Sequence, residues 1–269
     1  KHPEWTQDKT ARENLPEDPA GIYERARYSR DTVTEEEAKQ FIRQSVQIAA
    51  KARDRFWQEP KNRAGRTRPL IAGSVGPYGA YLADGSEYRG DYTISENQLA
   101  DFHRQRMALL IEAGADFLVC ETVPCLWEAQ VMAKVVGEFP EVCCWISFSC
   151  NSEDTVCDGT SVKVCAAAMD VYPQVAAIGI NCTAPHLIPS LLDGMRSATQ
   201  KPLAVYPNSG EVYDPVSKTW RGTGEAGAFA AASRLWHAHG ASLIGGCCRT
   251  TPAHIAQVYS WVSEQRKAL

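Results

Sequence analysis

The sequence predicts an α/β fold of the (β/α)8-barrel type, and three observations support this. The 269 residues suit one large domain of the size usual for such a barrel. From residue 69 onward, short apolar runs alternate with helical patterns, which indicates a parallel sheet with helical crossovers. Polar and special residues gather just after the apolar runs, at the edge where barrels of this type place their active sites.

Six apolar runs are the expected strands, and each is followed by a loop and a helical pattern. These runs cover residues 69–75, 117–120, 142–148, 176–180, 202–206 and 242–245. The helical patterns cover residues 95–113, 127–139, 162–172, 186–195, 226–239 and 252–265. Ser95 with Gln98 has the form of a capping box, and Thr34 with Glu37 opens an earlier helix in the same way.

The start of the chain does not fit this pattern. Residues 1–31 are polar, charged and proline-bearing, with no strand-like run. A closed eight-stranded barrel needs two more strands than the six found, and an open sheet would have two unpaired edges. Either the chain is a fragment or variant of a barrel, or the barrel closes in another way. We therefore expect a single domain over residues 1–269, with residues 1–31 atypical and the first two strands not recognisable.

Composition narrows the class of protein. The net charge of −4, with both signs spread along the chain, argues against nucleic acid or an anionic membrane as partner. No apolar run approaches the ~18 residues of a membrane span, and no signal peptide opens the chain. The ten cysteines resemble reduced thiols rather than a disulfide framework, which predicts a cytoplasmic protein. The sequence indicates no oligomeric state.

Three cysteines stand at the ends of apolar runs. Cys247 and Cys248 follow two glycines after the last run, and Cys182 ends the run that begins at residue 176. Three converging thiolates with an open fourth position describe a catalytic zinc site and suggest chemistry on a sulfur substrate. Two alternatives remain open from the residues alone. The cysteines pack as small apolar side chains, or Cys247 and Cys248 form a vicinal disulfide in a redox protein.

Five ordered motifs carry a family resemblance. They are Ala72-Gly-Ser-Val-Gly-Pro-Tyr-Gly-Ala80, Cys120-Glu-Thr-Val-Pro124, Gly179-Ile-Asn-Cys182, Tyr206-Pro-Asn-Ser-Gly210 and Gly245-Gly-Cys-Cys-Arg249. From about residue 35 to its end, the chain resembles the homocysteine S-methyltransferase family, and most closely the members that use S-methylmethionine or S-adenosylmethionine. The resemblance implies zinc-dependent methyl transfer from such a donor to the thiolate of L-homocysteine, giving methionine. It also implies that small molecules are the partners.

The resemblance assigns roles to particular residues. Cys182, Cys247 and Cys248 match the family's zinc ligands, with the homocysteine thiolate as the fourth ligand. Glu121 resembles the carboxylate that receives the amino group of homocysteine, although a solvated charge at a strand end is the alternative. Asn181 is expected to orient the ligand loop or to contact substrate.

The remaining predicted site residues belong to the motif around Pro207. Tyr206, Asn208 and Ser209 are expected to line the donor pocket, and plain turn chemistry is the alternative. No histidine is assigned to zinc. Family members normally begin with a strand and an acidic turn that helps to bind homocysteine, and residues 1–31 match neither. The alternative function is therefore a non-catalytic zinc-binding remnant or variant that lacks a complete substrate site.

Overall fold

The computed structural model describes residues 34–214, 219–222 and 224–268, so the prediction for residues 1–31 lies outside the described residues. Six parallel strands form one sheet in the order β1-β2-β3-β4-β5-β8. Their bounds are Ala72–Val75 (β1), Phe117–Val123 (β2), Cys144–Phe148 (β3), Val175–Asn181 (β4), Leu203–Tyr206 (β5) and Ala241–Ile244 (β8). All six predicted strands are confirmed, and β2 continues three residues beyond its predicted end.

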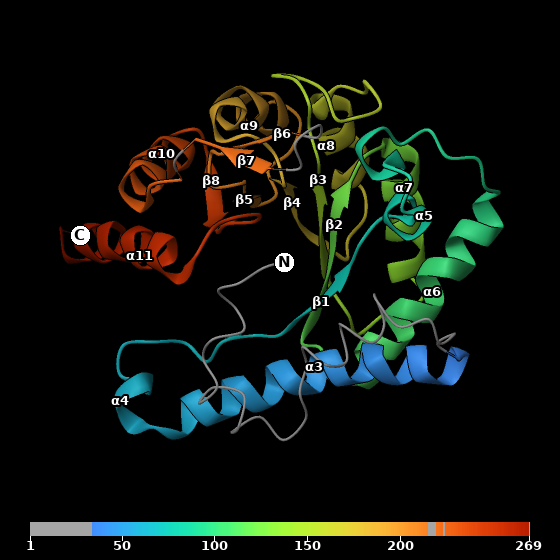
Figure 1. Ribbon diagram of the computed structural model, residues 1–269, viewed down its shortest axis with the longest axis horizontal. Helices are drawn as coiled ribbons and strands as arrows, with labels where there is room; N and C mark the ends of the chain where they lie inside the picture. The colour runs from blue at the N-terminus through green and yellow to red at the C-terminus, as the bar shows by residue number, and fades with distance from the viewer. Residues whose placement is uncertain (1–33, 215–218, 223, 269) are drawn as a thin grey trace.

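A helix follows each strand of this sheet and returns the chain to the next one. The helices form an arc around the sheet (Figure 1), and their bounds are Glu96–Glu112 (α6), Leu126–Val136 (α7), Val162–Asp170 (α8), Ile188–Arg196 (α9), Ala226–Ala238 (α10) and Pro252–Ala268 (α11). A 3-10 turn, η2 (Pro185–Leu187), precedes α9. The capping box of Ser95 and Gln98 begins α6, as predicted.

The two faces of the sheet differ in character. Side chains alternate along a strand, so residues two apart share a face. One face packs under the helices and is fully buried, with Leu118 paired in register with Cys144 and Ile178 paired with Leu203. On the opposite face, Trp145 packs between two aromatic rings. The centroid of its ring lies 5.0 Å from that of Phe117 and 6.1 Å from that of Tyr206. This inner face therefore carries an aromatic row toward the carboxyl edge of the strands.

The long helix α3 (Glu35–Gln58) lies beside α6 along one end of the sheet (Figure 1), and the short α4 (Pro60–Arg63) follows it. Thr34 and Glu37 form the predicted capping box. Two ion pairs join α3 to α6 and its end, Arg43 to Glu112 at 3.3 Å and Arg53 to Asp116 at 3.0 Å.

The sheet is open within the part of the chain that the structure describes, because β1 and β8 stand at its two edges and do not pair with each other. Three short features were not predicted. The segment after β1 holds α5 (Tyr78–Leu82) and a 3-10 turn, η1 (Ser86–Tyr88), and a hairpin of β6 (Val212–Asp214) and β7 (Thr219–Arg221) follows β5. Each is too short to show a periodicity in the sequence. No helix over the described residues is long and apolar enough to cross a membrane.

Candidate metal centre

Cys182 is the first residue after β4, and its backbone turns sharply there. Its φ of 52° lies in the left-handed region, which is uncommon for a residue other than glycine. The Cys182 amide donates to the carbonyl oxygen of Tyr206 at 3.3 Å, which ties the strand end to β5. The thiol is thereby directed along the carboxyl edge of the sheet rather than to either face.

Cys247 and Cys248 lie in a tight turn after β8 that is tied to the turn after β5. The Cys247 amide donates to the carbonyl of Pro207 at 2.8 Å, and the Cys248 carbonyl accepts from the Ser209 amide at 3.0 Å. The hydroxyl of Thr250 closes the turn by donating to the Cys247 carbonyl at 2.7 Å. The two turns therefore form one hydrogen-bonded unit.

Glycine is required at position 246 within this unit. A Cβ on Gly246 would lie 2.5 Å from Oγ1 of Thr250, which is closer than atoms in real structures approach. Any larger residue would displace the hydroxyl that closes the cysteine turn.

The three sulfur atoms converge as the sequence predicts. Sγ of Cys248 lies 3.6 Å from Sγ of Cys182 and 4.0 Å from Sγ of Cys247, and all three sulfurs lie within 4.8 Å of one another. Tetrahedral zinc with Zn–S bonds of about 2.3 Å places its sulfurs about 3.8 Å apart. The spacing therefore fits a tetrahedral thiolate centre. All ten cysteines are free, and Cys248 lies nearer to Cys182 than to Cys247, which favours this interpretation over a vicinal disulfide.

The thiols of the cluster differ in the direction in which their pKa values are shifted. Hydrogen bonds from Cys182 and then Cys247 lower the pKa of Cys248 to about 3. Hydrogen bonds with Cys247 and then Cys248, followed by burial, raise the pKa of Cys182 well above its usual range. Three cysteine sulfurs at this spacing are a donor set suited to a soft divalent cation, and Cys248 is exposed, which leaves one side of the cluster open.

An ion pair supports the cysteine turn from outside. Arg249 has a left-handed backbone, with φ of 67°, and its Nε donates to Oε2 of Glu211 at 2.8 Å. The same carboxylate oxygen accepts a hydrogen bond from the Ser209 hydroxyl at 3.1 Å. Glu211 thus links the residue after Cys248 to the turn after β5.

Glu121 lies inside β2, near a bulge, rather than just past the strand end as predicted. Its carboxylate accepts a hydrogen bond from the Ser74 hydroxyl at 2.5 Å. Burial raises the pKa of Glu121, hydrogen bonds from Ser74 and Tyr206 lower it in part, and the charge of Cys247 raises it. Glu121 is therefore a partly buried carboxylate on the inner face, within electrostatic reach of the cysteines.

Asn181 is 1% exposed, and both ends of its amide form hydrogen bonds with one residue of β2, which β3 separates from β4 in the sheet. Its Oδ1 accepts from the amide of Thr122 at 2.8 Å, and its Nδ2 donates to Oγ1 of Thr122 at 2.8 Å. Thr122 has a left-handed backbone with φ of 61°. The side chain of Asn181 is therefore committed to holding the residue that follows Glu121.

The motif around Pro207 contributes three side chains with different surroundings. The Tyr206 hydroxyl accepts from Nε1 of Trp145 at 3.1 Å, and burial raises its pKa above the usual range. Oδ1 of Asn208 is buried and has no hydrogen-bond partner among the described residues. Ser209 is buried and bonds Glu211. Of the three, Asn208 alone presents an unused acceptor.

Two further features near the site were not singled out residue by residue from the sequence. Tyr88, in η1, is 60% exposed; burial and then the charges of Cys182, Glu87, Cys248 and Cys247 raise its pKa. A fully buried pair, His103 and Glu128, joins α6 to α7 at 2.8 Å. Glu128 is buried among apolar residues of α7 that include Ala129, Val131 and Met132, and no pattern in the sequence marks it as buried.

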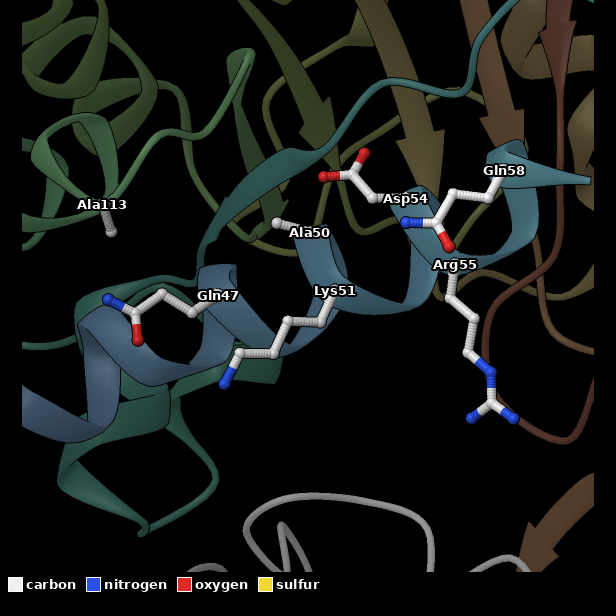
Figure 2. Close-up of a pocket in the computed structure, with 7 residues that line it drawn as sticks. All are labelled: Gln47, Ala50, Lys51, Asp54, Arg55, Gln58 and Ala113. Atoms are coloured by element: carbon white, nitrogen blue, oxygen red, sulfur yellow. The ribbon is translucent and has the colours of Figure 1, made fainter.

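A surface hollow along α3 does not belong to this site. Six of its seven lining residues come from α3, and the seventh is Ala113 after α6 (Figure 2). None of the predicted site residues lines it.

Comparison with known proteins identifies the class. A family model described as Homocysteine S-methyltransferase matches residues 22–262. The chain therefore belongs to the homocysteine S-methyltransferase family, and the resemblance read from its motifs is confirmed.

Individual relatives agree with this assignment. The chain is 54% identical over 229 residues to homocysteine S-methyltransferase YbgG of Bacillus subtilis, covering 85% of this chain and 73% of the relative. It is 48% identical over 223 residues to a homocysteine S-methyltransferase of Escherichia coli, covering 82% and 71%. The metallated form of the homocysteine methyltransferase MmuM from Escherichia coli superposes with a TM-score of 0.75 at 42% identity, covering 90% of this chain and 75% of that one.

Proposed function

We propose that this protein transfers a methyl group from S-methylmethionine or S-adenosylmethionine to the thiolate of L-homocysteine, giving methionine. We propose Zn²⁺ as the cofactor and Cys182, Cys247 and Cys248 as its ligands. One observation carries the proposal: three cysteine sulfurs meet at the carboxyl edge of the sheet, where a partly buried carboxylate, Glu121, feels the charge of Cys247. Membership of the family supports the reaction class.

The donor set suits zinc because thiolates are the ligands that zinc prefers, and three protein ligands leave a fourth position for substrate. When bound, zinc keeps a substrate thiol deprotonated near neutral pH, where a free thiol with a pKa of about 8.5 is mostly protonated. The protein's own part is to hold the three sulfurs in place, through the hydrogen bonds from the Pro207 turn and the ion pair of Arg249 with Glu211.

Glu121 is proposed to receive the ammonium group of homocysteine. Its carboxylate lies on the inner face near Cys247, and an arriving ammonium would stabilise its ionised form against the effect of burial. The unpaired Oδ1 of Asn208 is a second acceptor suited to an ammonium or amide donor of a substrate. Tyr206 and Ser209 are proposed to shape the pocket for the methyl donor, and Asn181 to orient the strand end.

The chemistry needs little from the protein beyond alignment. A sulfonium donor loses its methyl carbon with the bonding electrons left on sulfur, so the departing product is a neutral thioether. The new bond forms from the thiolate sulfur of homocysteine to that carbon, and no proton has to move. Bringing two sulfurs into line with one carbon is a proximity effect, which is worth several kcal/mol in favourable cases.

The competing function is a non-catalytic zinc-binding variant of the family. An incomplete inner face would keep the cysteine cluster and lose turnover, and the open sheet among the described residues favours considering it. We further infer a reducing compartment such as the cytoplasm, since all ten cysteines are free.

The deciding experiment follows a labelled methyl group. Reduced, zinc-loaded protein is offered homocysteine with S-methylmethionine or S-adenosylmethionine, each deuterated in the transferred methyl, and labelled methionine is measured by mass spectrometry. Cys248→Ser serves as the matched control, because it keeps the shape of the side chain and removes the thiolate. Labelled methionine from the parent and not from Cys248→Ser supports the proposal. Folded, zinc-bound protein without turnover supports the non-catalytic variant.

A further inference from the structure

The segment from Tyr78 to Tyr92, called here the 78–92 segment, leaves β1 at the same edge of the sheet that carries the cysteines. It contains α5 and η1, and Figure 1 shows α5 beside α7. Because β1 is parallel to β4 and β8, the segment carries Tyr88 to the edge of the sheet at which the cysteines lie. Burial and then the charges of groups that include the three cysteines raise the pKa of Tyr88, which agrees with this placement.

Both ends of this segment are held by one carboxylate. Glu128 lies in the first turn of α7 and is fully buried. Its Oε1 accepts from the amide of Tyr78 at 2.7 Å, and its Oε2 accepts from the hydroxyl of Tyr92. A buried carboxylate that accepts donors from residues 78 and 92 closes the intervening chain into a loop of fixed span.

The protonation of the cluster follows from its hydrogen bonds. The guanidinium of Arg106 has only donors, and it lies 2.8 Å from Nδ1 of His103, so that nitrogen accepts. Nε2 of His103 then carries the proton and donates to Oε1 of Glu128 at 2.8 Å. Burial lowers the pKa of His103, which agrees with a neutral ring. Glu128 thus accepts hydrogen bonds from three donors, the Tyr78 amide, the Tyr92 hydroxyl and the His103 ring.

The segment is also packed against itself and against the start of α7. A Cβ on Gly79 would lie 2.5 Å from the amide nitrogen of Glu87. Gly90 has φ of 72°, and a Cβ there would lie 2.9 Å from Cβ of Cys125. The middle of the segment remains exposed, and Arg89 has a side chain that is 52% exposed. Because the ends of the segment are fixed and its middle is exposed, the position of Tyr88 depends on the hydrogen bonds of Tyr78 and Tyr92 to Glu128.

We propose that Glu128 is a positioning residue, which clamps both ends of the 78–92 segment and thereby fixes Tyr88 at the carboxyl edge of the sheet, the edge that carries Cys182, Cys247 and Cys248. The clamp itself does not depend on the proposed function. The consequence for methyl transfer does, because Tyr88 would border the space above the sulfurs where substrate is proposed to bind.

The first test is limited proteolysis of the full chain at Arg89. Tyr92→Phe removes one hydrogen bond to Glu128 and keeps the ring in place. A hydrogen bond to a charged group corresponds to about a ten- to hundredfold change in the population of the released segment. Trypsin cleavage after Arg89, measured by mass spectrometry, is expected to accelerate by that factor. Tyr259→Phe, an exposed tyrosine on α11, is the matched control and is expected to behave as the parent.

The second test reports on Tyr88 and requires no turnover. Protein labelled with 3-fluorotyrosine is loaded with Zn²⁺ or Co²⁺, and the Tyr88 fluorine signal is assigned with Tyr88→Phe. In the parent, Co²⁺ at the cysteines is expected to broaden this signal relative to Zn²⁺, and in Tyr92→Phe the broadening is expected to decrease. Glu128→Gln is expected to change both readouts in the same direction as Tyr92→Phe. If Glu128→Gln does not fold, the result for Tyr92→Phe alone decides whether the clamp exists.

Two results would overturn the proposal. Cleavage after Arg89 at the parental rate in Tyr92→Phe would mean that Glu128 does not clamp the segment. Faster cleavage with an unchanged Tyr88 signal would mean that the clamp does not position Tyr88. Neither result bears on whether labelled methionine forms, so failure here is distinguishable from failure of the proposed methyl transfer.

Discussion

Replacing Asn181 by alanine is expected to destabilise the carboxyl edge of the sheet at a point between the carboxylate and the cysteines. Asn181 holds both the amide and the hydroxyl of Thr122, at 2.8 Å each, and is 1% exposed. Thr122 follows Glu121, and Asn181 precedes Cys182. The change therefore removes the one side chain that ties these two positions together across β2 and β4.

The magnitude follows from the groups that lose partners. Two neutral hydrogen bonds contribute about 1 kcal/mol each, and a buried amide left without an acceptor adds about 1–3 kcal/mol. Thr122, released from its left-handed backbone, recovers about 1–2 kcal/mol of strain. The net loss in the free energy of unfolding is about 1–4 kcal/mol, which corresponds to roughly 2–16 °C in Tm for a chain of this size.

The assay is urea unfolding of four proteins in a double-mutant cycle: the parent, Asn181→Ala, Thr122→Gly and the double variant. Thr122→Gly relieves the left-handed strain and removes the hydroxyl, so the two changes are expected to couple by at least about 0.5–1 kcal/mol. Asn97→Ala, at an exposed position on α6, is the control for losing an asparagine amide. A loss below about 0.5 kcal/mol in Asn181→Ala, or additivity in the cycle, would refute the reasoning.

Four further predictions concern the site and its surroundings. Cys248→Ser is expected to lower zinc affinity more than about a hundredfold in a chelator competition, since loss of a ligand exceeds loss of an outer partner; full activity would contradict the three-thiolate centre. Glu121→Gln is expected to raise KM for homocysteine about 10- to 100-fold with zinc retained. Because burial raises the pKa of Glu121, kcat/KM of the parent is expected to rise as pH increases through that raised pKa, and kcat/KM of the variant is expected to lack this rise. Glu211→Gln weakens the support of Arg249 and is expected to lower zinc affinity about tenfold, measured in the same competition. Burial lowers the pKa of His103 in the folded state, so the unfolded state protonates this ring first as pH falls below about 6.5. The free energy of unfolding is therefore expected to fall by up to ~1.4 kcal/mol per pH unit below that pH. A flat pH profile of stability that is unchanged in His103→Gln would contradict this.

The sequence was sufficient for the sheet because its strands are buried on the helix-facing side and read as apolar runs. It was insufficient for the end of β2, where Glu121 and Thr122 interrupt the apolar run although the strand continues to Val123. Backbone pairing with a bulge carries the strand through these polar residues, and a hydrophobicity pattern does not report backbone pairing. The sequence therefore placed Glu121 near the end of this strand, but it did not predict that Glu121 lies inside the strand and is partly buried.

The cysteine cluster was predictable because five ordered motifs carry the family resemblance, which selects among the alternatives that three thiols at strand ends leave open. The buried pair of His103 and Glu128 was not, because charged residues on helices are usually exposed and pattern analysis assigns them to the solvent face. Only contacts between α6, α7 and the 78–92 segment show that this position is enclosed. Those contacts join residues that are 25–50 positions apart in sequence, a separation at which a single sequence gives no signal.

Backbone strain at the carboxyl edge explains how the site is assembled. In the described residues, Thr122, Cys182 and Arg249 are three of the four non-glycine residues with positive φ, and each is, or directly follows, a proposed site residue. Side chains that are adjacent along a regular strand point to opposite faces, so convergence of Glu121 with the sulfurs requires that each strand end be turned out of regular geometry. Such turns cost about 1–3 kcal/mol each and persist only where other contacts hold them. Asn181 provides those contacts for Thr122, and Glu211 provides them for Arg249. The strained turns at this edge therefore help to bring the three thiols together and to place Glu121 at the same edge of the sheet. Relieving the strain at Thr122 is expected to stabilise the fold and to loosen the site.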